Sequence, residues 1–112
     1  MVHADATYCV VLVTAGSREN ASLIAGTLIE ERLAACCNIL PGLTSVYRWE
    51  GRVAEDEEVL LICKTRTEHF PQLERRVRDL HTYDVPEVIQ LPVTAGSAPY
   101  LAWIDESLTG SP

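Results

Sequence analysis

Val59-Leu60-Leu61-Ile62-Cys63 is apolar at every position, and this run is the clearest indication of how the chain folds. Tyr8 to Val13 has the same character, and residues 34–40 are nearly as apolar. Side chains of a strand alternate between the two faces of a sheet, so these strands place hydrophobic groups on both faces. A chain of 112 residues is too short to cover both faces itself. We therefore expect a small subunit that buries one face of its sheet against other copies, with its functional site between subunits.

Composition excludes several classes of partner. The chain has 16 acidic and 9 basic residues, a formal net charge of -7, and no basic stripe, so nucleic acids and anionic membranes are poor partners. No stretch approaches the ~20 apolar residues of a membrane span. Residues 1–5 lack the basic region of a signal peptide. We expect one domain over residues 1–112 in a cytoplasmic protein.

The predicted elements follow one another as strand, helix, strand, strand, helix, strand and a final helix. Their ranges are, in that order, 7–14, 17–33, 35–49, 52–65, 67–80, 87–91 and 97–108. This βαββαβ order with right-handed crossovers predicts an α+β ferredoxin-like sandwich, in which the helices cover one face of an antiparallel sheet. The long hairpin over residues 35–65 and the extra C-terminal helix are additions to that fold.

Local signals refine these elements. Ser17 is expected to cap the first helix and Thr67 the second. The buried stripe of the first helix is expected to include Ile29 and Leu33. Pro41-Gly42 interrupts the first arm of the hairpin, where we expect a bulge or a kink.

The hairpin is too long for the body of the molecule. At ~3.3 Å per residue, residues 36–49 would span about 46 Å, whereas a compact chain of this length is roughly 34 Å across. The hairpin must therefore bend or extend beyond its own subunit. Tyr47 and Trp49 lie near its tip, and exposed aromatic groups of this kind favour docking on a neighbour.

Some functions of this fold are disfavoured by the sequence. RNA-binding modules stack bases on aromatic side chains of the sheet, and residues 58–64 have none. No nucleophile, base and orienting group can be read from the spacing, so we expect no enzyme. The four cysteines include no C-x-x-C pair, and buried, inert thiols are the expected state. Cys9, Cys37 and Cys63 fall on strands that the topology can place side by side, which leaves a thiol cluster as an open alternative.

The residues with the most chemistry fall into two groups. Glu58 and Lys64 share one face of their strand and flank two apolar residues, so they form either part of a ligand site or an ion pair at a subunit contact. His81, Tyr83 and Glu87 surround the end of the second predicted helix. A histidine there can be a cap, a pH-sensitive group or a metal ligand.

With these residues in view, the sequence resembles the CutA divalent-cation tolerance family over nearly its whole length. The resemblance rests on blocks in the same order along the chain: Leu33-Ala34-Ala35-Cys36, Asn38-Ile39, Pro41-Gly42, Ser45-Val46-Tyr47, Trp49-Glu50-Gly51, Glu58, Lys64-Thr65, His81-x-Tyr83-x-x-Pro86-Glu87 and Tyr100-Leu101-x-Trp103-Ile104. It implies a homotrimer with the sheets facing inward and the hairpins reaching onto neighbouring subunits.

The resemblance also implies a role in tolerance to divalent cations, copper in particular, with Cu(II) or another divalent cation as the expected ligand. Family members with a proposed copper site carry a thiol and a second imidazole where this chain has Val13 and Leu80. His81 is the remaining candidate metal ligand, with Glu87 or a cysteine as helper. Because Cu(II) favours several nitrogen or oxygen ligands, we expect the site to recruit groups across the trimer.

An alternative comes from the trimeric PII signalling proteins, which CutA subunits are similar to in architecture. Clefts between subunits would then hold a small anionic metabolite instead of a metal. The residues expected to line such a cleft are Lys64, His81, Tyr83, Tyr47 and Trp49, with Glu58 nearby.

Overall fold

The structure, a computed structural model, describes residues 6–109. Its elements are β1 (Tyr8–Ala15), α1 (Arg18–Glu30), β2 (Cys36–Trp49), β3 (Arg52–Arg66), a 3-10 turn η1 (Thr67–His69), α2 (Phe70–Leu80), β4 (Val88–Pro92) and α3 (Ala98–Thr109). The strands form one antiparallel sheet in the order β2-β3-β1-β4. This arrangement confirms the predicted α+β ferredoxin-like sandwich with its long hairpin and additional C-terminal helix. The expected absence of a signal peptide concerns residues 1–5, which lie outside the described range.

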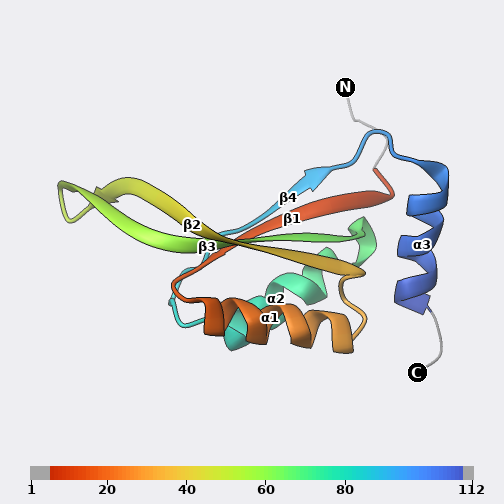
Figure 1. The fold of residues 1–112 in the computed structure, drawn as a ribbon, viewed down its shortest axis with the longest axis horizontal. Helices are drawn as coiled ribbons and strands as arrows, with labels where there is room; N and C mark the ends of the chain where they lie inside the picture. The colour runs from red at the N-terminus through yellow and green to blue at the C-terminus, as the bar shows by residue number, and fades with distance from the viewer. Residues whose placement is uncertain (1–5, 110–112) are drawn as a thin grey trace.

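One face of the sheet is covered by α1 and α2 (Figure 1). Val11 and Val13 of β1 and Leu61 and Cys63 of β3 point into this layer and have no exposed surface. Fully buried side chains from both helices pack against them, so this face forms the main hydrophobic core of the chain. None of the helices in residues 6–109 is long and apolar enough to cross a membrane.

The opposite face, which we call the helix-free face, consists of the alternate residues of the same strands. Leu12 lies opposite Ile62 of β3 and Ile89 of β4, which places an apolar row across the sheet. Leu40, Ile89 and Leu91 are 43%, 48% and 44% exposed on this face. The predicted hydrophobic groups on both faces are therefore present, and α1 and α2 cover only one of these faces.

The hairpin of β2 and β3 projects from the body of the molecule (Figure 1). The molecule measures 45 Å along its longest axis, and its radius of gyration of 15.0 Å exceeds the ~13 Å of a compact chain of similar length. The pairing shifts between Leu40 and Leu43, and Gly42 has a φ of 85°, which confirms the bulge expected at Pro41-Gly42.

Two local expectations about the helices need correction. Ile29 is 42% exposed. The buried side of α1 instead includes Asn20, whose side-chain amide donates to the Leu80 carbonyl at the end of α2. Leu33 is buried, but it follows the end of α1. Thr67 begins η1 and donates its hydroxyl to the Ala6 carbonyl, so it ties down the start of β1 and does not cap α2. The Ser17 cap is confirmed, since its hydroxyl oxygen accepts the backbone N–H of Asn20 at 3.1 Å.

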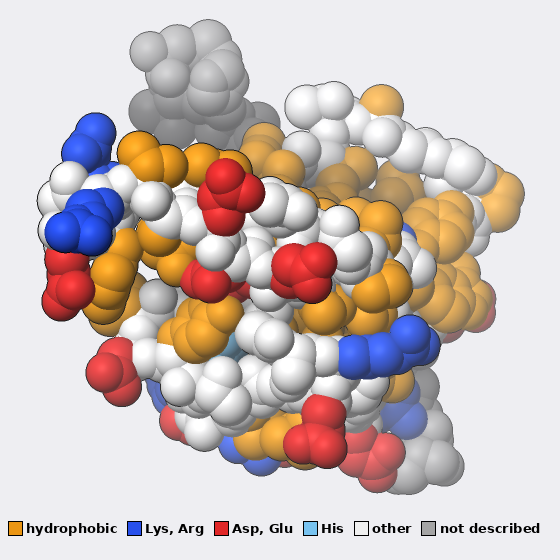
Figure 2. Space-filling view, turned by 60° about the vertical axis from the view of Figure 1, so that its left-hand side comes forward, with side chains coloured by type: hydrophobic (Ala, Val, Ile, Leu, Met, Phe, Trp, Pro, Cys, Tyr) orange, Lys and Arg blue, Asp and Glu red, His pale blue; other side chains and the backbone are white. Residues whose placement is uncertain are grey.

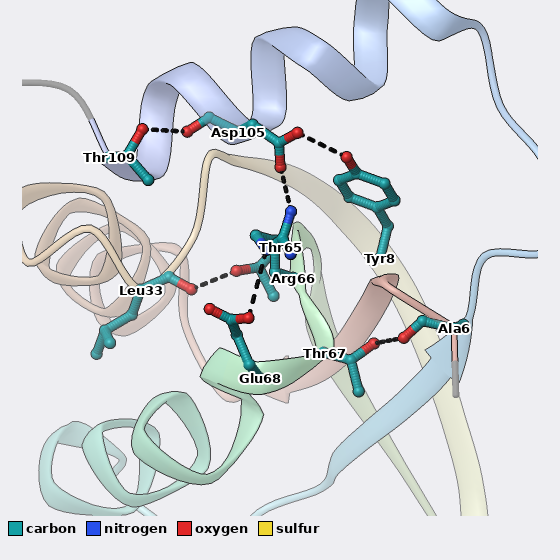
Figure 3. Close-up of polar contacts among 9 residues, drawn as sticks. All are labelled: Ala6, Tyr8, Leu33, Thr65, Arg66, Thr67, Glu68, Asp105 and Thr109. Atoms are coloured by element: carbon teal, nitrogen blue, oxygen red, sulfur yellow. Dashed lines mark hydrogen bonds and ion pairs between the residues drawn. The ribbon is translucent and has the colours of Figure 1, made fainter. Parts of the chain in front are cut away.

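Helix α3 stands across the end of the sheet (Figure 1). Its Asp105 carboxylate accepts the Tyr8 hydroxyl at 2.7 Å and lies 2.5 Å from the Arg66 guanidinium (Figure 3). Tyr8 and Arg66 are register partners on the helix-free face. The chain thus covers this end of the helix-free face with its own last helix and leaves the middle open.

Candidate functional site

His81 lies immediately after α2, where the chain leaves the helix toward β4. Its Nε2 is 2.7 Å from the Thr14 carbonyl oxygen, and its Nδ1 accepts the backbone N–H of Tyr83 at 3.0 Å. A carbonyl only accepts, so Nε2 carries the proton and Nδ1 holds the lone pair of the neutral ring. Both ring nitrogens are therefore engaged within the chain.

Tyr83 connects His81 to the hairpin. Its ring lies 4.6 Å from the His81 ring, and its hydroxyl donates to the Glu58 carboxylate at 2.7 Å. Burial, followed by the hydrogen bond to Glu58, raises the pKa of Tyr83 to about 12. A Cβ at Gly16 would come within 2.9 Å of the Tyr83 hydroxyl oxygen, so Gly16 leaves room for this ring. We call His81, Tyr83 and Glu58 the Tyr83 cluster.

A second tyrosine pairs with a carboxylate next to this cluster. Tyr47 on β2 donates its hydroxyl to Asp56 on β3, and this contact raises the pKa of Tyr47. Asp56 also contributes to the raised pKa of Tyr83, as does Tyr47 itself. The Tyr83 cluster and the Tyr47–Asp56 pair therefore form one acidic neighbourhood. Figure 2 brings the hairpin end forward and shows hydrophobic side chains at the surface between acidic ones.

The other candidate ligand residues lie elsewhere in the chain. Lys64 contacts Asn38 and sits opposite Val10 and Cys36. At ~3.3 Å per residue, it is about 20 Å along β3 from Glu58, so the two do not pair within one chain. Trp49 is 63% exposed at the tip of the hairpin. Glu87 is exposed just before β4.

No group of three or more His, Cys, Asp or Glu side chains within residues 6–109 is arranged to hold a metal ion. Val13, at one of the positions where the resemblance implies a metal ligand, is a fully buried core residue. Leu80 packs against the main core. Residues 6–109 of one chain therefore do not supply a complete set of metal ligands around His81.

The structure adds two participants that the sequence did not reveal. Thr14 contributes a backbone carbonyl, which leaves no signal in a side-chain pattern. Asp56 is one of four consecutive acidic residues, and the pattern alone does not indicate which of them meets a tyrosine. Gly16 is visible in the sequence only as part of the turn before the Ser17 cap, and the structure shows that its missing side chain leaves room for the Tyr83 ring.

Comparison with known proteins gives consistent matches. The model of the family described as CutA1 divalent ion tolerance protein matches residues 9–107. The divalent-cation tolerance protein CutA of Thermus thermophilus is 56% identical over 98 residues, which are 88% of this chain and 95% of that protein. A chloroplastic CutA protein of Arabidopsis thaliana is 51% identical over 88% of this chain, and the match spans 54% of that longer protein.

Solved structures agree with the sequence matches. CutA1 from Oryza sativa superposes with a TM-score of 0.90 at 47% identity, over 96% of this chain and 98% of that one. The Thermus thermophilus protein gives a TM-score of 0.85 at 56% identity, over 87% of this chain and 94% of that one. With the fold, the sequence blocks and both kinds of comparison in agreement, this chain belongs to the CutA1 divalent ion tolerance family.

Proposed function

We propose that this protein acts in divalent-cation tolerance as a non-enzymatic, cytoplasmic homotrimer. In this proposal it binds a divalent cation, Cu(II) in particular, at junctions between subunits around His81. The names of its relatives supply the general role, and the negative charge around Tyr83 supplies the class of ligand.

The observation that carries the proposal is the negative charge of the Tyr83 cluster together with the neighbouring Tyr47–Asp56 pair. The carboxylates of Glu58 and Asp56 accept hydrogen bonds from two tyrosines there and raise the pKa of both. Groups that disfavour a tyrosinate also disfavour a bound anion, and they stabilise a cation. Lys64 lies far along β3, so within one chain it does not offset this charge. A metal ion therefore fits the neighbourhood better than the anionic metabolite of the PII-like alternative.

His81 imposes a condition on the metal site. Only Nδ1 has a lone pair, and this nitrogen already accepts the Tyr83 N–H. A metal on Nδ1 would replace that hydrogen bond, while Nε2 would keep its bond to the Thr14 carbonyl and orient the ring. Because the chain offers a single imidazole here, the remaining ligands would come from a neighbouring subunit, with Glu87 or a cysteine as candidates.

The trimer in this proposal follows from surfaces that one chain leaves uncovered. The middle of the helix-free face exposes Leu40, Ile89 and Leu91. Trp49 and Val53 are 63% and 70% exposed at the tip of the projecting hairpin. A ring of copies would bury the first set at its centre and dock the second on an adjacent subunit.

Titration calorimetry with Cu(II) and Zn(II) tests the metal site. The His81→Ala variant is expected to lose about tenfold or more in affinity, since changes even to groups behind the ligands have that effect. His69→Ala is the control, because His69 lies at the other end of α2. Equal affinities in the wild type and the His81→Ala variant would remove His81 from the site.

A second pair of variants tests the electrostatic part. Glu58→Gln keeps a hydrogen-bond acceptor for Tyr83 and removes the charge, so it should weaken cation binding. Glu57→Gln removes the same charge from the neighbouring position, which points to the opposite face of β3, and should have a smaller effect. A thermal-shift screen with anionic metabolites should give no saturable response. Stabilisation by a metabolite without any effect of metals would instead favour the PII-like alternative.

A further inference from the structure

Two of the four cysteines lie in contact across the base of the hairpin. Cys37 of β2 and Cys63 of β3 are directly opposite in the antiparallel register, and their sulfur atoms are 3.4 Å apart. Opposite residues in antiparallel strands have Cα atoms about 4.5 or 5.5 Å apart, and disulfides form at Cα separations of about 4.4–6.8 Å. The backbone is thus already placed for a disulfide, and the sulfurs need to approach by about 1.4 Å.

The two thiols differ in their access to solvent. Cys63 has no exposed surface, whereas Cys37 is partly exposed at the edge of the main core. Cys36 is adjacent in sequence but points to the other face of β2, opposite Lys64. A small reagent can therefore reach Cys37 first, and Cys63 can react only with a group already on Cys37.

The electrostatic environment assigns the same order. Contact with the Cys63 thiol and the nearby positive charge of Lys64 lower the pKa of Cys37 despite its partial burial. Contact with Cys37, together with burial, raises the pKa of Cys63. Of the two thiols, Cys37 therefore ionises more readily and is the attacking group, and Cys63 keeps its proton until the second step.

We propose that Cys37 and Cys63 are a redox-active dithiol pair that closes to a cross-strand disulfide on reaction with small-molecule disulfides. The Cys37 thiolate attacks one sulfur of the small disulfide, breaks its S–S bond and releases one small thiolate. Cys63 then loses its proton to the solvent and attacks the Cys37 sulfur of the mixed disulfide, which releases the second small thiolate. The protein loses two hydrogen atoms, the small disulfide is reduced to two thiols, and one S–S bond replaces another. This chemistry uses no metal ion and does not involve His81.

The experiment uses the whole 112-residue chain, oxidised glutathione as the probe, and a chelator that excludes metal-catalysed oxidation. After incubation, free thiols are alkylated under denaturing conditions and counted by mass spectrometry. We expect two alkylated thiols in place of the four found in the reduced protein. Because a tryptic peptide carries Cys36 together with Cys37, the linkage is mapped in the Cys36→Ser variant, which should form the disulfide as the wild type does.

Two further variants separate the steps. The Cys63→Ala variant should stop at a stable mixed disulfide between Cys37 and glutathione. The Cys37→Ser variant should form no mixed disulfide with glutathione, and its Cys63 should remain a free thiol. Circular dichroism of both variants verifies that they are folded. In the wild type, the closed disulfide should raise the thermal midpoint by about 5 °C or more, because it constrains the unfolded chain, and dithiothreitol should reverse the shift. Four free thiols after incubation, a persistent mixed disulfide in the wild type, or a link through Cys36 or to a second molecule would each overturn the proposal.

Discussion

The two faces of the sheet are made by the same strands and differ in whether one chain completes them. On the covered face, Leu61 of β3 is fully buried beneath α1 and α2. On the helix-free face, Ile89 and Leu91 remain nearly half exposed although they are equally apolar. The difference shows that the hydrophobic pattern of a strand reports all the surfaces it will bury, including those that other copies must supply.

Helix α3 marks the limit of what the chain covers by itself. It reaches Tyr8 and Arg66 at one end of the helix-free face and holds them through Asp105 (Figure 3). Beyond this end, no helix of residues 6–109 covers the apolar row of Leu12, Ile62 and Ile89. The proposed assembly would therefore begin where α3 ends.

The largest expected effect comes from placing a charge on the helix-free face. Ile89→Asp would bury an unpaired carboxylate in every proposed subunit contact, at a cost of about 3 kcal/mol or more for each, which is more than a hundredfold in an association constant. Sedimentation velocity should show folded monomers. Leu23→Asp is the matched control, because Leu23 is 53% exposed on α1 and Ile89 is 48% exposed. An Ile89→Asp protein that assembles like the wild type would contradict the proposed interface.

Adjacent leucines on β3 compare the two faces more closely. Leu61→Ala opens a cavity in the main core and should lower the free energy of unfolding by about 2–5 kcal/mol at any protein concentration. Leu60→Ala acts on the helix-free face, so its cost should fall on the association of the subunits and should therefore vary with protein concentration. Urea denaturation at two protein concentrations separates these cases. Equal losses for both variants at both concentrations would mean that the faces are equivalent.

A smaller effect is expected at the start of α1, which belongs to the covered layer alone. Ser17→Ala removes the hydroxyl that accepts the Asn20 amide and should cost about 1 kcal/mol of stability. The association constant should not change, because α1 lies on the far side of the sheet from the helix-free face. Ser17→Asp retains a capping oxygen and should restore most of the stability in thermal denaturation.

The smallest expected effect concerns pH at the end of the sheet. The Tyr8 hydroxyl and then the Arg66 guanidinium hold the pKa of Asp105 below its ordinary value of 3.8. The ionised carboxylate therefore stabilises the folded chain fully above pH 3.8, and this contribution is lost as the pH falls through the lowered pKa. Asp105→Asn should be less stable at neutral pH and should lose less stability on acidification. Parallel acid profiles for the wild type and the variant would rule out this role.

Much of the fold was predictable because its signals are local and periodic. The apolar runs of β1 and β3 predict the sheet, Ser17 predicts the start of α1, and Pro41-Gly42 predicts the bulge. Ile29 was misplaced because the buried side of α1 depends on where α2 packs. Thr67 was misassigned because its partner, the Ala6 carbonyl, is remote in sequence.

The candidate site was predictable only in part. Tyr83, His81 and Glu58 were all candidates, and the structure adds the hydrogen bond that joins Tyr83 to Glu58. Lys64 and Glu58 point to the same face of β3. The alternation of side chains along a strand predicts this shared face but not the distance between the two residues, and they lie far apart along β3. The engagement of both His81 nitrogens by backbone groups could not be read from side-chain identities.

The oligomeric state of the wild-type protein in dilute solution is the most direct test of the claim that other subunits of the same protein cover the helix-free face. Sedimentation equilibrium over a range of protein concentrations measures it without reference to any ligand. We predict a species of three copies that persists on dilution. A stable, folded monomer throughout the range would contradict the claim and leave Ile89 and Leu91 exposed to water.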